Sequence, residues 1–302
     1  MADSLLTMAA ANQAGAGSAV ERDRNGQWPE IAAHWRLIGI PLRPSAQDLD
    51  FCLEAVLQWS RDQGRPPRVL MLGVTPELFH LPWPAGTDFL AVDRTQEMID
   101  YVWPGPRDKV LCSDWRCMRL PENSRDIVLC DGGLHLLAFP EELHRLTHLL
   151  KKVVSDRGIC IFRLYIPPRH QEFPDSVIRD LMDGKISNLN VLKLRLGMSL
   201  MKSADEGVEL DTVWRVLEAA APDLRKLASR LGWPFSHIAA IYAYRGSRAR
   251  YYFSMPDQLS ALFCNGQGGF KFHDLREPTY ELSERCPTVI FERQMRIAKV
   301  RL

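Results

Sequence analysis

RVLMLGVTPELF, residues 68–79, joins an apolar run to a turn at Gly73 and then to the start of a helix. A short run that is almost entirely apolar and ends in glycine is typical of a buried strand in a parallel sheet. Pro76 suits the first position of a helix, and the Thr75 side chain can accept a cap hydrogen bond there. The stretch therefore predicts the strand, turn and helix N-terminus that begin a doubly wound α/β sheet.

Further apolar runs alternate with helical segments as far as residue 165. They are DFLAVD (88–93), KVLCSD (109–114), RDIVLCD (125–131) and GICIFRLY (158–165). Strands that alternate with helices pair in parallel, and helices on both faces of the sheet explain why each run is so apolar. Near the end of the chain, FKFHDL (270–275) and TVIFER (288–293) predict an antiparallel hairpin that closes the α/β fold.

The chain divides into five parts by composition and periodicity. Ser45 and Asp48 form a capping pair before one N-terminal helix, and two long amphipathic stretches follow the fifth strand. The expected parts are a flexible tail, 1–26; N-terminal helices that cover a cofactor, 27–67; the core sheet, 68–165; an inserted helical cap, 166–250; and a C-terminal helix with the strand hairpin, 251–302.

Composition excludes several classes of protein. The 38 basic residues are offset by 37 acidic ones, so no basic surplus indicates nucleic-acid binding. The seven cysteines form no CxxC pair and indicate reduced thiols, with neither a disulfide framework nor a metal site. No apolar run is long enough to cross a membrane. We therefore expect a cytoplasmic protein that acts on a small molecule, and the oligomeric state is left open.

Acidic residues and glycines stand at the carboxyl ends of the predicted strands. Asp93 ends the second run, twenty residues after Gly73, where a carboxylate can accept hydrogen bonds from both hydroxyls of a ribose. The third run ends in Ser113, Asp114 and Trp115, and the fourth in Asp131 and Gly132. Because the carboxyl ends of parallel strands meet at one crevice, these groups are expected to line a ligand site. Each aspartate has an alternative role as the cap of the helix or turn that follows it.

Residues 68–165 resemble the class I S-adenosylmethionine (SAM)-dependent methyltransferases. The resemblance implies a Rossmann-like mixed sheet with an antiparallel last strand, and SAM as the cofactor. In that family the first glycine turn cradles methionine, the acid after the second strand holds the ribose, and the acid after the third receives the adenine amino group. The implied cofactor-binding residues are Gly73, Val74, Thr75, Asp93, Arg94, Met98, Ser113, Asp114, Trp115, Asp131 and Gly132.

The first turn departs from the family pattern, because residues 73–78 contain one glycine where the family has three. The same departure argues against NAD, whose pyrophosphate needs the close backbone approach of G-x-G-x-x-G. The departure puts the methionine end of SAM in question. Arg43 in the segment PLRPS (41–45) can pair with the carboxylate of the cofactor, or it is an ordinary surface arginine.

Few residues are expected to act on the sulfonium directly, because the enzyme mainly positions a nucleophile and excludes water. His135, after the fourth strand, and Tyr165, expected at the mouth of the crevice, are the candidate catalytic residues. His135 can instead face the helix that follows it. The aromatic stretch 241–253 can surround a substrate or the sulfonium, but core packing is the favoured interpretation.

Three functions remain open at this point. The size of the predicted cap favours methyl transfer to a small metabolite. The depleted glycine turn supports an alternative in which SAM is the sole substrate and cyclises to azetidine-2-carboxylate, releasing methylthioadenosine. A non-catalytic SAM-binding regulatory subunit is the third possibility.

Overall fold

The computed structural model describes residues 27–265 and 269–295, so the predicted flexible tail lies outside the described residues. The described chain begins with helix α3 (Trp28–Ala33), the 3-10 helix η1 (Trp35–Leu37) and helix α4 (Ala46–Gln63). The start of α4 is the predicted capping box. The Ser45 hydroxyl accepts a hydrogen bond from the Asp48 amide, and the Asp48 carboxylate accepts one from the Ser45 amide.

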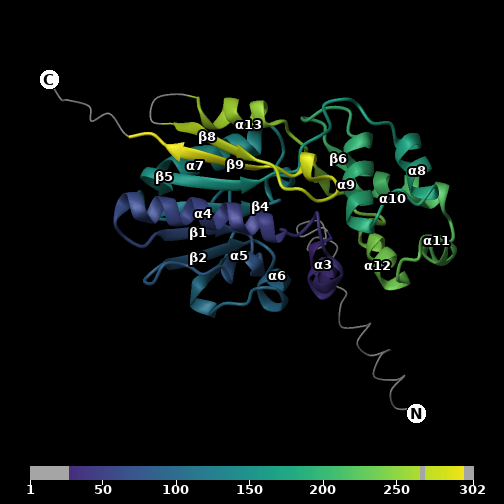
Figure 1. Cartoon of the computed structure of the whole chain (residues 1–302), viewed down its shortest axis with the longest axis horizontal. Helices are drawn as coiled ribbons and strands as arrows, with labels where there is room; N and C mark the ends of the chain where they lie inside the picture. Colours follow the sequence, from purple (N-terminus) through teal and green to yellow (C-terminus); the bar gives the residue numbers. More distant parts are fainter. Residues whose placement is uncertain (1–26, 266–268, 296–302) are drawn as a thin grey trace, which may run out of the picture.

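Seven of the described strands form one large mixed sheet with the order β3-β2-β1-β4-β5-β9-β8 (Figure 1). Strands β1 to β5 pair with one another in parallel, whereas β9 is antiparallel to both β5 and β8. The strands are β1 (Arg68–Leu72), β2 (Asp88–Asp93), β3 (Val110–Cys112), β4 (Arg125–Asp131), β5 (Val154–Arg163), β8 (Phe270–Arg276) and β9 (Thr288–Arg293). The predicted mixed Rossmann-like sheet is therefore confirmed. The strand order reverses between β1 and β4, which is where sheets of this kind bind ligands.

Helices cover both faces of this sheet, as the apolar strands require. In β1, Val69 and Met71 face the cluster that contains α4, whereas Leu70 and Leu72 face the opposite cluster. The connecting helices are α5 (Pro76–Phe79), α6 (Gln96–Tyr101), η2 (Arg107–Lys109), η3 (Leu134–Leu136), α7 (Glu141–Val153), α13 (Pro256–Phe263) and η5 (Ser283–Arg285). Helices α3, α4 and α6 pack on the first face, and α7 with α13 on the second.

The segment between β5 and α13 gathers into a mainly helical body beside the sheet (Figure 1). Its elements are α8 (Pro174–Met182), α9 (Leu189–Leu200), β6 (Val208–Glu209), α10 (Leu210–Ala220), α11 (Leu224–Leu231), α12 (Phe235–Ala239), η4 (Ala240–Tyr244) and β7 (Arg250–Tyr251). These helices bury an apolar cluster of their own. Strands β6 and β7 pair in an antiparallel ladder that sequence patterns missed, because two residues are too few for a detectable alternation.

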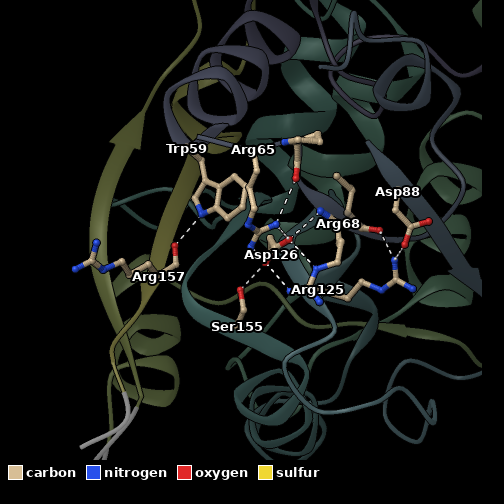
Figure 2. Close-up of polar contacts among 10 residues, drawn as sticks. Trp59, Arg65, Arg68, Asp88, Arg125, Asp126, Ser155 and Arg157 are labelled. Carbon is tan, nitrogen blue, oxygen red and sulfur yellow. Dashed lines mark hydrogen bonds and ion pairs between the residues drawn. The ribbon is translucent and has the colours of Figure 1, made fainter. Parts of the chain in front are cut away.

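A buried carboxylate ties together the amino ends of the central strands (Figure 2). Asp126 at the start of β4 is fully buried, and its two oxygens accept hydrogen bonds from Arg65 and Arg68 at 2.8–2.9 Å. The Ser155 hydroxyl donates another at 2.7 Å. Although burial opposes the charge, these donors hold the pKa of Asp126 far below its usual range. The network lies at the amino ends of these strands, whereas a ligand crevice is expected at their carboxyl ends.

Candidate functional site

A pocket of about 730 Å³, partly open to solvent, lies at the carboxyl ends of β1, β2 and β4. Every cofactor-binding residue predicted from the sequence lines this pocket except Arg43 and Ser113. The strand topology therefore brings together side chains that are up to about sixty positions apart in the sequence.

The turn after β1 forms one wall of the pocket. Gly73 has a φ of +101°, a conformation that side chains rarely allow, and its amide donates to the Val92 carbonyl at 2.8 Å. Val74 and Thr75 follow it into the wall and are buried. Thr75 is the N-cap residue of α5, but its side chain makes no cap hydrogen bond, so that prediction is wrong. Helix α5 has one turn only, and Thr75, which precedes it, lines the pocket.

Asp93, at the end of β2, presents its carboxylate to the pocket. One oxygen accepts a hydrogen bond from the Thr95 amide at 2.8 Å. Burial raises the pKa of Asp93 from 3.8 to about 6, despite the opposing effect of the Thr95 amide. A ligand with hydroxyl groups can therefore add hydrogen bonds that stabilise the charged form of this carboxylate.

Asp114, after β3, lines the pocket and also binds its own turn. One carboxylate oxygen accepts from the amide and from Nε of Arg116, each at 2.8 Å, and Arg116 in turn contacts Glu142. Although burial opposes the charge, Arg116 holds the pKa of Asp114 below its usual range. The alternative role of Asp114 in its turn is thus present in the structure. Ser113 does not reach the pocket, and its amide bonds to the Asp93 carbonyl.

Asp131, after β4, forms a buried ion pair with Arg163 of β5. The Arg163 Nε lies 2.5 Å from the carboxylate, and the two side chains are 4% and 6% exposed. Arg163 also donates to the Pro41 carbonyl at 2.7 Å. Attraction to Asp131 outweighs burial and raises the pKa of Arg163 above its usual value. The pair fastens the 41–45 segment onto the end of the sheet.

Tyr165 is not at the mouth of the crevice, so that expectation is wrong. Its side chain is 5% exposed, because the 41–45 segment covers the end of β5. The hydroxyl donates to the Leu42 carbonyl at 3.0 Å and accepts from Arg163 at 3.1 Å. Burial raises the pKa of Tyr165 well above its usual value, which makes the phenol a poor base at neutral pH.

His135 is buried among aromatic rings and does not line the pocket. Its ring is parallel to Phe253 at a centroid distance of 5.6 Å and meets the Tyr251 ring edge-on at 4.3 Å. Burial lowers the pKa of His135 to about 3, so the ring is neutral, and Nδ1 has no hydrogen-bond partner. Both candidate catalytic residues thus lie behind the pocket wall, and their catalytic roles stay predictions.

Two tryptophans complete the pocket from the N-terminal helices. Trp28 of α3 and Trp35 of η1 both line it, and the buried indole nitrogen of Trp35 has no hydrogen-bond partner. We did not single out these residues in the sequence, although their spacing of seven in WPEIAAHW places them on one helical face. The N-terminal segment therefore supplies an unused donor and two aromatic surfaces.

Arg43 does not face the pocket. Its Nε donates to the Glu77 carboxylate at 2.5 Å, and its guanidinium lies 5.4 Å from the centroid of a Trp35 ring. Glu77 lies in the first turn of α5, directly after the altered glycine turn. The binding of Arg43 to a cofactor carboxylate stays a prediction, and it requires this ion pair to open.

The helical segment 166–250 contributes no residue to the pocket wall among the residues that the structure describes. In the aromatic stretch 241–253, Tyr244, Tyr251 and Phe253 are buried in the cluster of this helical body, which agrees with the core-packing interpretation. Within 27–265 and 269–295, no three His, Cys, Asp or Glu side chains are grouped to hold a metal ion. In the same ranges, no helix has the length and apolarity of a membrane span.

Comparison with solved structures finds the same fold in other proteins. A protein from Rhodobacter sphaeroides, described as a candidate Zn-dependent alcohol dehydrogenase, is 16% identical, covers 87% of this chain and 98% of its own, and has a TM-score of 0.55. The N-methyltransferase NodS from Bradyrhizobium japonicum, in complex with S-adenosylhomocysteine (SAH), is 11% identical, covers 90% and 99%, and has a TM-score of 0.46. Neither family models nor curated proteins match the sequence. The Rhodobacter sphaeroides protein shares its overall fold with this chain, and the sheet has the mixed order with an antiparallel β9 that the resemblance to the class I methyltransferases implied.

Proposed function

We propose that this protein is a cytoplasmic enzyme that binds SAM in the pocket and transfers the methyl group to a small molecule. The observation that carries the proposal is the convergence of the Gly73 turn, Asp93 and Asp114 on one pocket where the strand order reverses. Each of these three elements matches a different part of SAM. A pocket that merely filled space between helices would not need carboxylates at the ends of both β2 and β3.

The proposed orientation of SAM follows from the lining groups. The ribose hydroxyls donate to Asp93, whose carboxylate also accepts a hydrogen bond from the Thr95 amide. Adenine lies against the buried Met98 side chain, with its amino group toward Asp114. The methionine chain lies along the Gly73 turn, where the unpartnered indole N–H of Trp35 can donate to its carboxylate.

Methyl transfer needs an in-line nucleophile and a pocket without water. In the transfer the S–CH₃ bond breaks, its electron pair stays on sulfur, and the acceptor forms the new bond to carbon. Leu136, Leu137 and the two N-terminal tryptophans give the pocket an apolar wall, which suits an apolar or aromatic acceptor. We do not propose nucleic acid as the acceptor, because the chain has a formal net charge of +1.

Cyclisation of SAM is the second candidate, and one observation favours it. The pocket wall in the described chain contains no residue of segment 166–250, so the expected acceptor cap does not enclose the site. A reaction with SAM as sole substrate needs no second binding region. In that reaction the amine of SAM attacks its own γ-carbon, the Cγ–S bond breaks with its pair on sulfur, and the amine releases a proton to solvent.

Incubation of the purified protein with SAM, alone and with a mixture of small-molecule acceptors, tests the proposal. We expect SAM to survive alone and SAH to form when acceptors are added. Methylthioadenosine that forms from SAM alone, faster than without enzyme, supports the cyclase and contradicts methyl transfer. Binding of SAM without consumption under every condition contradicts both enzymes and favours a regulatory subunit.

A further inference from the structure

The side chain of Trp115 lines the pocket and reaches the turns that follow β1 and β4. A Cβ atom built at Gly133 would lie 2.8 Å from Cη2 of this indole, and one built at Gly73 would lie 3.9 Å from Cζ2. The ring therefore spans the ends of β1 and β4 and also lines the pocket. The indole N–H donates to the Val92 carbonyl at 2.7 Å, which fixes the ring in this position.

In the proposed orientation of SAM, the sulfur lies beside this ring. The ribose lies on the side of Asp93 and the methionine chain on the side of Gly73, and the sulfur joins the two. Sulfur carries a full positive charge in SAM, whereas it is neutral in SAH and in methylthioadenosine. Whatever surrounds the sulfur therefore decides how strongly the pocket separates substrate from product.

Each carboxylate that lines the pocket in the described chain has a partner other than the sulfur. Asp131 is paired with Arg163, and Asp114 is paired with Arg116. Asp93 is the acceptor for the ribose in the proposed orientation. Aromatic rings also attract a cation, through the negative face of the ring, and three tryptophans line the pocket: Trp28, Trp35 and Trp115. Trp35 already has the Arg43 guanidinium beside its ring. Of the other two, Trp115 is the one whose ring reaches both Gly73 and the Val92 carbonyl, which directly precedes Asp93.

We infer that Trp115 selects the sulfonium form of the ligand, so that the pocket binds SAM more tightly than its neutral thioether products. The inference rests on the proposed function, but it holds for both methyl transfer and cyclisation, because each reaction leaves sulfur uncharged. Trp115 then has two consequences. It contributes to substrate binding, and it weakens retention of the product once the charge is lost.

Calorimetric dissociation constants for SAM, SAH and sinefungin test the inference. Sinefungin carries an ammonium group in place of the sulfonium and is stable. We expect the unmodified protein to bind SAM and sinefungin roughly five- to thirtyfold more tightly than SAH. This comparison needs no variant. Equal affinities, or tighter binding of SAH, would overturn the inference alone, whereas failure of all three ligands to bind would overturn the proposed function as well.

Two substitutions at Trp115 and one control assign the preference to the ring. Trp115→Leu is expected to reduce the ratio of SAH to SAM dissociation constants to near one, and Trp115→Phe, which keeps an aromatic face, to retain most of it. Met98→Leu is the control, because it alters the adenine contact and should weaken all three ligands by a similar factor. A leucine variant that folds and keeps the full ratio contradicts the role of Trp115. If the leucine variant does not fold, a folded Trp115→Phe protein whose ratio of SAH to SAM dissociation constants falls to near one contradicts the role of Trp115.

Discussion

Asp126→Asn is expected to lower the free energy of unfolding by about 2–4 kcal/mol, since hydrogen bonds to a charged group contribute about 1.5–3 kcal/mol each but do not add fully. The amide keeps the size of the carboxylate and loses its charge. It also turns an NH₂ group toward Arg65 and Arg68, whose guanidinium groups converge on this side chain (Figure 2). The two arginines are partly exposed and can regain water, which keeps the loss below that of a fully buried pair. Chemical denaturation measures the difference.

The pH dependence of this difference in the free energy of unfolding provides a second check. The pKa of Asp126 is lower in the folded protein than in the unfolded chain, so its contribution is complete above the unfolded pKa and is lost as the pH falls. We expect a constant difference between wild type and Asp126→Asn above about pH 5, and a shrinking one below about pH 4. Asp88→Asn is the control, because Asp88 is 46% exposed and should contribute less than about 1 kcal/mol. Equal effects of the two substitutions would contradict the role assigned to Asp126.

Gly132→Ala is expected to lower the free energy of unfolding by about 2–5 kcal/mol. Gly132 has a φ of +57°, and a Cβ there would lie 2.5 Å from Cζ and from the hydroxyl of Tyr165. The left-handed conformation costs about 1–2 kcal/mol for alanine, and overpacking of a buried site adds about 1–3 kcal/mol. Tyr165 cannot move easily, because its hydroxyl is bonded to the Leu42 carbonyl and to Arg163.

Gly184→Ala separates these two contributions. Gly184 has a φ of +70°, but a Cβ there meets nothing within 4 Å. Its substitution should therefore cost only the backbone part, about 1–2 kcal/mol. Thermal unfolding of both variants measures the difference. A Gly132→Ala protein as stable as Gly184→Ala would show that Tyr165 does not press against the turn as the structure indicates.

The sequence was sufficient to predict the sheet and most of the pocket. Parallel strands align their carboxyl ends, so a residue at the end of a recognisable strand, such as Asp93, has a predictable place. Trp115 shows the limit of that reasoning, since its position after β3 was predictable but the direction of its ring was not. The ring turns back over Gly73 because the Val92 carbonyl accepts its N–H.

Interactions between distant segments account for what the sequence did not reveal. Tyr165 and His135 were expected near the ligand, but whether a strand end is open depends on the segments that fold over it. Here residues 41–45 cover Tyr165, and rings from the stretch 241–253 enclose His135. The pairing of Arg43 with Glu77 likewise joins two segments, and no local pattern marks it. Local sequence patterns do not show which distant segment will cover the end of a strand.

The most direct test of the account is calorimetric titration of SAM into the wild-type protein and into Asp93→Ala, repeated between pH 5 and 8. We predict one site per chain and a loss of about 1.5–3 kcal/mol in the variant, roughly 10- to 150-fold in dissociation constant. Because burial raises the pKa of Asp93 to about 6, wild-type affinity should be constant above about pH 7 and fall as the pH drops below 6, while the variant stays flat. Wild-type affinity for SAM in a correctly folded Asp93→Ala protein, at every pH, would contradict the proposed site.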